Sequence, residues 1–202
     1  AEVVELLRDM ETLAKIIEAR RRREGMLHLD LTETELVFDK AGQVVDAHPA
    51  DTSYPHTIIE MFMVEANEAV ARMLDGVNVP FMRRIHPDPD SLSLKKLSET
   101  LKLFGVPAPR NIDRFDLQNI IDAVKGRPMA YAVNIYVLRS LARAEYSPLS
   151  IGHFALASRH YCHFTSPIRR YADLLVHRLF DRYMKGKNFE NIPSQDDLAA
   201  IG

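Results

Sequence analysis

Amphipathic segments of helical period, most of them bounded by glycine or proline, constrain this fold more than any other feature of the sequence. Apolar side chains recur at helical spacing in residues 2–24, 55–75, 91–105, 117–126 and 129–144, and again from Pro167 onward. This spacing predicts helices that each bury one face. Asp90 or Ser91 and Asp116 are candidate N-caps, and Gly105 is a candidate left-handed helix end.

Short strands complete the predicted fold class. Residues 26–39 and 43–50 alternate or are rich in β-branched side chains on either side of Lys40-Ala41-Gly42, which is typical of a hairpin. Residues 80–86 and 152–158 are two further strand candidates. We therefore predict an α+β fold, a helix-rich mixed domain with a small antiparallel sheet.

Composition limits the functional classes. The chain has 202 residues, enough for one domain or for one domain with a small appendage. A net charge of −2 argues against a surface built for non-specific nucleic-acid binding, yet arginines cluster locally and can hold an anion at one place. The single cysteine, Cys162, excludes an internal disulfide and indicates a reducing cytoplasm. No apolar run is long enough to span a membrane.

The two ends of the chain suggest a fragment of a longer protein. Residue 1 is Ala and already lies in a helical pattern, and the last residues resemble the first turns of a helix. We expect three parts. They are residues 1–24, a helix that continues from an upstream part; residues 25–185, the main domain; and residues 186–202, the start of a truncated C-terminal helix.

The densest group of polar side chains lies in the segment HFTSPIRRYADLLVHR. Pro167 is suited to the first turn of a helix, and Thr165 or Ser166 is placed to cap it. The first turn of such a helix presents free N–H groups and the positive end of the helix dipole. Arg169 and Arg170 add guanidinium donors on that turn. This combination predicts a phosphate-binding site.

Two more polar residues follow at helical spacing. Asp173 can hold one of the arginines in place while the other reaches a ligand, and His177 lies one turn further along. The alternative is a capped surface helix whose i, i+4 ion pairs contribute only a few tenths of a kcal/mol each. The residues alone leave both interpretations open.

The segment GHFALASRHYCHFTSPIRRYADLLVHR, residues 152–178, resembles without a gap the signature of the ribonuclease II family, exoribonucleases built around the RNB catalytic domain. Weaker matches occur in order along the chain, and the bacterial ribonuclease R branch is the most similar. They are GMLHLDL at 25–31, ELVFDKAGQVVDA at 35–47, HTIIEMFMVEANEAVARML at 56–74 and VLRSLARAEYSP at 137–148. The resemblance implies that residues 25–185 are the C-terminal portion of an RNB-type catalytic domain.

The family resemblance implies an activity and roles for two residues. Its members degrade single-stranded RNA processively from the 3′ end and release nucleoside 5′-monophosphates by metal-dependent hydrolysis. Arg169 matches the family's catalytic arginine, which contacts the scissile phosphate. Glu60 lies near a family glutamate that contacts a ribose 2′-hydroxyl, a contact that favours RNA over DNA. Here Glu60 is followed by Met61, where the family often has a second glutamate.

The resemblance also implies Mg²⁺ bound by a cluster of aspartates in the part of the domain that precedes this chain. The densest acidic stretches here are HPDPD at 86–90 and QDD at 195–197, and both are expected to be turn or cap aspartates. We therefore predict no metal ligand in this chain, and we expect it to be inactive alone.

Other side chains of the signature have two interpretations each. Tyr161 and Tyr171 can stack on RNA bases or pack in the core, and His153 and His163 can contact RNA or serve the fold. Cys162 is expected to be a buried, inert thiol. The run Arg20–Arg23 predicts a solvated helix end, or a rim that attracts RNA.

Two alternatives to a nuclease fragment stay open. One is a non-catalytic RNB-like module that binds RNA or a protein, which the absence of upstream aspartates in the parent protein would favour. The other is a helical domain that binds a nucleotide or another phosphorylated ligand. This second alternative predicts affinity for mononucleotides, whereas the nuclease interpretation predicts a steeply salt-dependent preference for single-stranded RNA.

Overall fold

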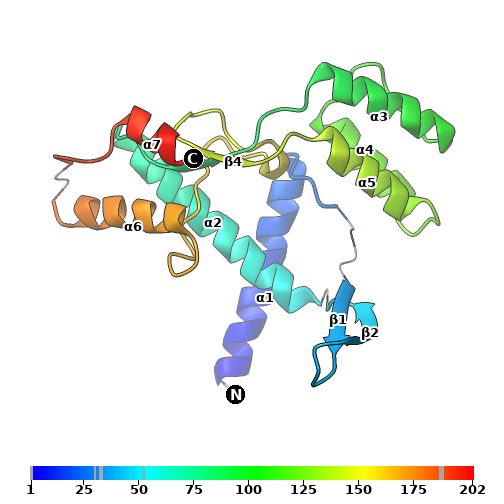
Figure 1. The fold of residues 1–202 in the computed structure, drawn as a ribbon, viewed down its shortest axis with the longest axis horizontal. Helices are drawn as coiled ribbons and strands as arrows, with labels where there is room; N and C mark the ends of the chain where they lie inside the picture. Colours follow the sequence, from blue (N-terminus) through cyan, green and yellow to red (C-terminus); the bar gives the residue numbers. More distant parts are fainter. Residues whose placement is uncertain (1, 30, 32–33, 52, 187–188) are drawn as a thin grey trace.

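A computed structural model describes residues 2–29, 31, 34–51, 53–186 and 189–202 (Figure 1). Its elements, in chain order, are α1 (Glu2–Arg23), β1 (Thr34–Phe38), β2 (Val44–Pro49), α2 (Tyr54–Gly76), β3 (Arg83–Ile85), α3 (Ser91–Leu103), α4 (Arg114–Val124), α5 (Ala130–Ser140), β4 (Glu145–Ser147), the 3₁₀ turn η1 (Phe154–Leu156), α6 (Tyr171–Met184) and α7 (Gln195–Ile201). The predicted α+β class is confirmed, although the strands form two separate two-stranded antiparallel sheets.

The helices pack around three apolar clusters. Helices α3, α4 and α5 share one cluster, α2 and α6 share a second, and α1 and α2 share a third. Figure 1 shows α3–α5 at one end of the molecule and α6 and α7 at the other, with α1 and α2 between them. The long helix α2 therefore packs against α6 in one cluster and against α1 in another.

The predicted hairpin is confirmed, but it is shorter than expected. Strands β1 and β2 pair antiparallel from Thr34 opposite Pro49 to Phe38 opposite Val44. Gly42 in the connecting turn has a φ of +78°, a conformation that favours glycine. Residues 26–29 are not part of β1, and residues 30, 32 and 33 lie outside the described residues.

The second sheet was only half predicted. Residues Arg83–Ile85 form β3 within the expected strand 80–86, and β3 pairs antiparallel with β4. The sequence pattern predicts a helix over residues 129–144 and no strand at residues 145–147. Helix α5 ends at Ser140 because Leu141 adopts an extended backbone with ψ of 149°. Apolar periodicity continues past this point, so it could not indicate the change of conformation.

The cap of α3 lies where the sequence predicts it, whereas the cap of α4 lies one turn earlier than predicted. Asp90 caps α3 by accepting a hydrogen bond from the Ser93 N–H at 2.9 Å, and Gly105 after that helix has a φ of +67°. The cap of α4 is Asp113, not Asp116. The Asp116 N–H donates to the Asp113 carboxylate at 2.8 Å, and the Asp113 N–H donates to the Asp116 carboxylate at 2.9 Å. Asp116 is therefore the reciprocal member of a capping box.

The C-terminal segment contains the expected helix. Residues 195–201 form α7, and Ser194 and Asp197 build a second capping box at its start. This is the cap role expected for the aspartates of the QDD stretch. Leu198 of α7 is buried against the rest of the molecule. None of the helices in the described part of the chain has the length and apolarity needed to cross a membrane.

The basic end of α1 is tied to acidic side chains, so the predicted solvated helix end is wrong for Arg21. This side chain is 1% exposed. Its Nε donates to Glu65 at 2.6 Å and a terminal nitrogen donates to Glu68 at 2.8 Å, both on α2. Arg20 also pairs with Glu65, and Arg22 pairs with Asp122 at 2.5 Å. These ion pairs join α1 to α2 and α4.

Substitution of Arg21 tests the importance of this buried ion pair. Arg21→Ala should lower the free energy of unfolding by about 3 kcal/mol, because it removes a buried charge from its partners and leaves its packing space empty. Urea denaturation followed by circular dichroism measures the change. Lys15→Ala removes the exposed Lys15–Glu11 pair of the same helix and should change stability little. Equal effects of the two substitutions would contradict the assignment.

Candidate functional site

The first part of the signature, residues 152–158, is a tight 3₁₀ turn and not the predicted strand. Gly152 has a φ of +79° and Ala157 a φ of +53°. The His153 N–H donates to the Ser158 carbonyl at 2.7 Å, which closes the turn. A Cβ on Gly152 would lie 2.7 Å from that carbonyl oxygen, so the close approach requires glycine. Alternating apolar residues cannot distinguish this turn from a strand.

The signature segment contributes a side chain to each of the three apolar clusters. Phe154 packs with α3–α5, Leu156 packs against the α1–α2 cluster, and Cys162 packs between α2 and α6. Burial raises the pKa of the Cys162 thiol to about 12. The thiol is therefore protonated and inert at neutral pH, as expected from the sequence.

The second part of the signature differs from the prediction at one decisive place. Helix α6 begins at Tyr171 rather than at Pro167, and its N-cap is Arg170, without a side-chain cap. Neither Thr165 nor Ser166 is an N-cap. The N–H groups of residues 169 and 170 donate to the Ser166 carbonyl at 3.3 and 3.1 Å, so residues 166–169 form a turn. Proline has the φ that the second position of such a turn needs, which is also the φ of a helix start.

Asp173 holds this turn in place. The carboxylate is fully buried, and its Oδ2 accepts hydrogen bonds from the Ser166 N–H and from the Arg170 guanidinium, both at 2.8 Å. Arg169, next in the turn, is exposed and forms no ion pair within the described residues. Three buried atoms of residues 165–173 have no hydrogen-bond partner among the described residues: Thr165 Oγ1, Arg170 Nε and Asp173 Oδ1.

His177 fixes the approach to the turn. Its Nε2 lies 2.7 Å from the Phe164 carbonyl oxygen, and its ring stacks on the Phe164 ring with centroids 4.0 Å apart. These contacts attach the extended residues before the turn to α6. The structure therefore gives His177 contacts that support the fold of the segment.

A row of aromatic and imidazole rings crosses the site. The rings contact one another edge to face in the order His86, His153, Tyr161, His163 and Tyr146, with centroids 4.9 to 5.9 Å apart. Burial is the main reason that the pKa of His153 falls to about 3 and that of His163 to about 4. Both imidazoles are therefore neutral at physiological pH. They can donate hydrogen bonds or stack, but they cannot supply a positive charge.

Asn67 of α2 is a site residue that the sequence interpretation missed. Its side-chain amide donates to the Tyr161 hydroxyl at 3.1 Å and accepts from the Phe164 N–H at 2.8 Å. Its backbone carbonyl accepts from the Cys162 thiol at 3.5 Å. The signal in the sequence was a single amide in the apolar stripe of α2, between Val64 and Ala71. A buried amide in such a stripe needs partners, and the signature segment provides them.

The remaining predicted site residues lie apart from this network. Glu60 is exposed on α2, two turns before Asn67, and it forms no side-chain hydrogen bond within the described residues. Tyr171 is the first residue of α6 and is 57% exposed. Its ring has the access to solvent that stacking on a base requires.

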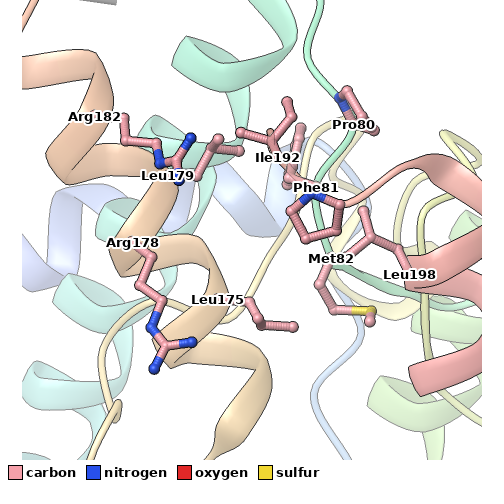
Figure 2. Close-up of a pocket in the computed structure, with 10 residues that line it drawn as sticks. Pro80, Phe81, Met82, Leu175, Arg178, Leu179, Arg182, Ile192 and Leu198 are labelled. Carbon is pink, nitrogen blue, oxygen red and sulfur yellow. The ribbon is translucent and has the colours of Figure 1, made fainter. Parts of the chain in front are cut away.

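Two pockets adjoin these elements. The larger, an open pocket of about 780 Å³, is lined on its polar side by Arg84, His86, Arg139, Arg143 and His153. The smaller, of about 170 Å³, lies between α6 and residues 192–198 (Figure 2). Its wall is mostly apolar and includes Phe81 and Leu198. Arg178 and Arg182 of α6 are its charged residues. The sequence interpretation assigned no individual role to any of these arginines.

The described residues do not fit a metal site. They contain no group of three or more His, Cys, Asp or Glu side chains arranged to hold a metal ion. Asp90 of the HPDPD stretch accepts two hydrogen bonds from Ser93 and Asp197 of the QDD stretch accepts two from Ser194, so both are occupied in caps.

Comparison with known proteins agrees with the sequence resemblance. Residues 1–186 match the RNB domain. The chain is 41% identical over 190 residues to ribonuclease R of Aquifex aeolicus, which is 93% of this chain and 27% of that protein. Ribonuclease R of Thermotoga maritima is 40% identical over 92% of the chain and 26% of its own length.

A solved structure shares the fold. RNase R of Mycoplasma genitalium in complex with ribose-methylated single-stranded RNA superposes with a TM-score of 0.91 at 32% identity, covering 98% of this chain and 32% of that one. The chain therefore belongs to the RNB domain family, which confirms the resemblance. It spans about a quarter of the length of the curated relatives that it matches.

The lowered pKa values of His153 and His163 predict a loss of stability in mild acid. In the unfolded chain each imidazole binds a proton near pH 6.5, whereas the folded chain resists protonation to about pH 3 and pH 4. The unfolded state therefore binds more protons below pH 6.5, so stability falls as the pH falls. Between pH 6.5 and 5 the free energy of unfolding should fall by up to about 1.4 kcal/mol per pH unit for each histidine.

Urea denaturation at a series of pH values measures this slope. The double substitution His153→Gln and His163→Gln should flatten it, and the exposed control His48→Gln should leave it as in the wild type. An unchanged slope in the double variant would show that other groups cause the acid sensitivity.

Proposed function

We propose that the chain is part of a processive 3′-to-5′ exoribonuclease that hydrolyses single-stranded RNA to nucleoside 5′-monophosphates. Membership of the RNB domain family and the similarity to an RNase R that was solved with single-stranded RNA support this proposal. The single buried, free cysteine agrees with action in the reducing cytoplasm.

The observation that carries the proposal is the different state of two adjacent arginines. The buried Asp173 carboxylate holds the guanidinium of Arg170, while Arg169 is exposed at the end of the turn and forms no ion pair within the described residues. In our proposal Arg169 contacts the scissile phosphate and stabilises the charge that develops on its oxygens. Arg170 and Asp173 position the turn from which Arg169 extends.

The other predicted residues have supporting roles in this proposal. Tyr171 supplies an exposed ring on which an unpaired base stacks, a contact that does not depend on base identity. Tyr161 is buried, so its ring serves the core rather than stacking on a base. Glu60 accepts a hydrogen bond from a ribose 2′-hydroxyl. That contact would need the RNA to pass along α2, since Glu60 lies two turns from Asn67.

In this proposal, the magnesium-binding site lies in the parent protein and outside the described residues. A divalent ion supplies an activated water and neutralises phosphate charge when it is bound. From the family resemblance we infer that its carboxylate ligands belong to the part of the parent protein that precedes residue 1, and the described residues form no such site. The chain alone is therefore proposed to bind RNA without hydrolysing it.

Arg169→Ala in the full-length parent tests the catalytic assignment. The substitution should lower kcat by about two to three orders of magnitude and change RNA affinity little, because the guanidinium acts mainly on the transition state. The rate of mononucleotide release from RNA measures kcat. Arg178→Ala, an exposed arginine of the same segment, is the control and should keep kcat near the wild-type value. Unchanged turnover of Arg169→Ala would overturn the assignment.

A comparison of the chain with its parent tests where the metal site lies. A 3′-labelled single-stranded RNA should be degraded by the parent only when magnesium is present. The 202-residue chain should release no mononucleotide with or without magnesium, because a metal-dependent step cannot proceed without the ion's ligands. Metal-dependent release by the chain alone would contradict the inferred location of the ligands.

A further inference from the structure

The open pocket beside the signature is the strongest site without a role. Its described lining includes three arginines, Arg84, Arg139 and Arg143, and no carboxylate. They come from three elements, namely β3, α5 and the connection that leads to β4. At about 780 Å³ the pocket is large enough to admit a nucleotide unit of a single strand.

These three arginines differ from six others in the described part of the chain. Arg20, Arg21, Arg22, Arg72, Arg83 and Arg170 are all paired with carboxylates. Arg84, Arg139 and Arg143 form no ion pair or side-chain hydrogen bond within the described residues. Cations that converge on one pocket without an acidic partner produce a positive potential there, and an anion would relieve their repulsion.

Arg84 is the best fixed of the three. Its guanidinium lies over the Tyr146 ring, 4.6 Å from the centroid, and its backbone N–H donates to the Tyr161 carbonyl at 3.1 Å. Stacking on a ring occupies the face of a guanidinium and leaves its edge N–H donors available. The side chain is therefore held in place before any ligand binds.

His153 adds a neutral donor to the same pocket. Its Nδ1 accepts the Leu156 N–H at 3.3 Å, so the proton of the uncharged ring resides on Nε2. His86 differs, because its Nδ1 accepts from the Ala155 N–H at 3.2 Å and its Nε2 donates to the Ala142 carbonyl at 2.8 Å. His86 thus closes the pocket wall, and His153 is the histidine with a donor left for a ligand.

We propose that Arg84, Arg139, Arg143 and His153 form a second phosphate-binding site, separate from Arg169. Its ligand is a phosphate of an RNA strand or of a nucleoside 5′-monophosphate. The ring of Tyr161 contacts His153 of this pocket and His163 of the signature segment. This inference rests on the proposed function. It adds a second contact with the ligand, at a phosphate other than the one that reacts.

The test is a binding titration of the 202-residue chain in EDTA, which separates affinity from hydrolysis. The double variant Arg139→Gln and Arg143→Gln changes exposed side chains only. It should bind a single-stranded oligoribonucleotide with a 5′-hydroxyl end about tenfold more weakly than wild type at moderate salt. The slope of log affinity against log salt should fall in magnitude by about 0.7 for each arginine. The matched control is Arg110→Gln with Arg127→Gln, two exposed arginines outside the pocket.

AMP and inorganic phosphate are the second arm of the test. Affinity for AMP that the Arg139 and Arg143 substitutions abolish would identify a terminal phosphate as the ligand. An effect on the oligonucleotide alone would identify an internal phosphodiester. The inference is overturned if the pocket variant matches the control for all three probes, or if the wild-type chain binds none of them. Loss of turnover in the parent's Arg169→Ala tests the proposed function independently of these results.

Discussion

The buried carboxylate of Asp173 is the interaction on which the rest of the site depends. A charge removed from water is tolerated only with partners, and here the Ser166 N–H and the Arg170 guanidinium serve as partners. The same two hydrogen bonds hold the 166–169 turn against the first turn of α6. Arg169 then extends from a turn that is anchored at both ends. The position of one exposed cation is thus determined by a buried anion.

The distribution of charge across the site follows from burial. The ring row from His86 to Tyr146 lies where desolvation keeps His153 and His163 neutral, and the guanidinium groups of Arg84, Arg139 and Arg143 line the pocket beside it. A strand of RNA makes two kinds of contact in alternation along its length. Its bases stack on uncharged rings, and its phosphates bind cations. In the function that we propose, the exposed ring of Tyr171 and the arginines of the pocket are the groups that meet these two demands.

The sequence predicted the elements that depend on local periodicity, and it failed where long-range contacts decide. The stripe of α2 and the turn at Gly42 were sufficient to predict a helix and a hairpin. The start of α6 was not predictable, because Pro167 suits a helix start and a β-turn equally and the choice depends on the buried Asp173. Arg21 shows the same limit, since an arginine at a helix end is buried only when two glutamates of another helix meet it.

The chemistry that this site can perform follows from which of its groups can exchange a proton. A thiol with a pKa of about 12 stays protonated at neutral pH, and imidazoles with pKa values of about 3 and 4 are weak bases there. Cys162, His153 and His163 are therefore unsuited to activate a water molecule. What these residues and Arg169 offer together is binding, stacking and stabilisation of charge. In the function that we propose, such a site lowers the barrier to phosphodiester hydrolysis only when another group activates the nucleophile, and the described residues are then one half of a divided active site.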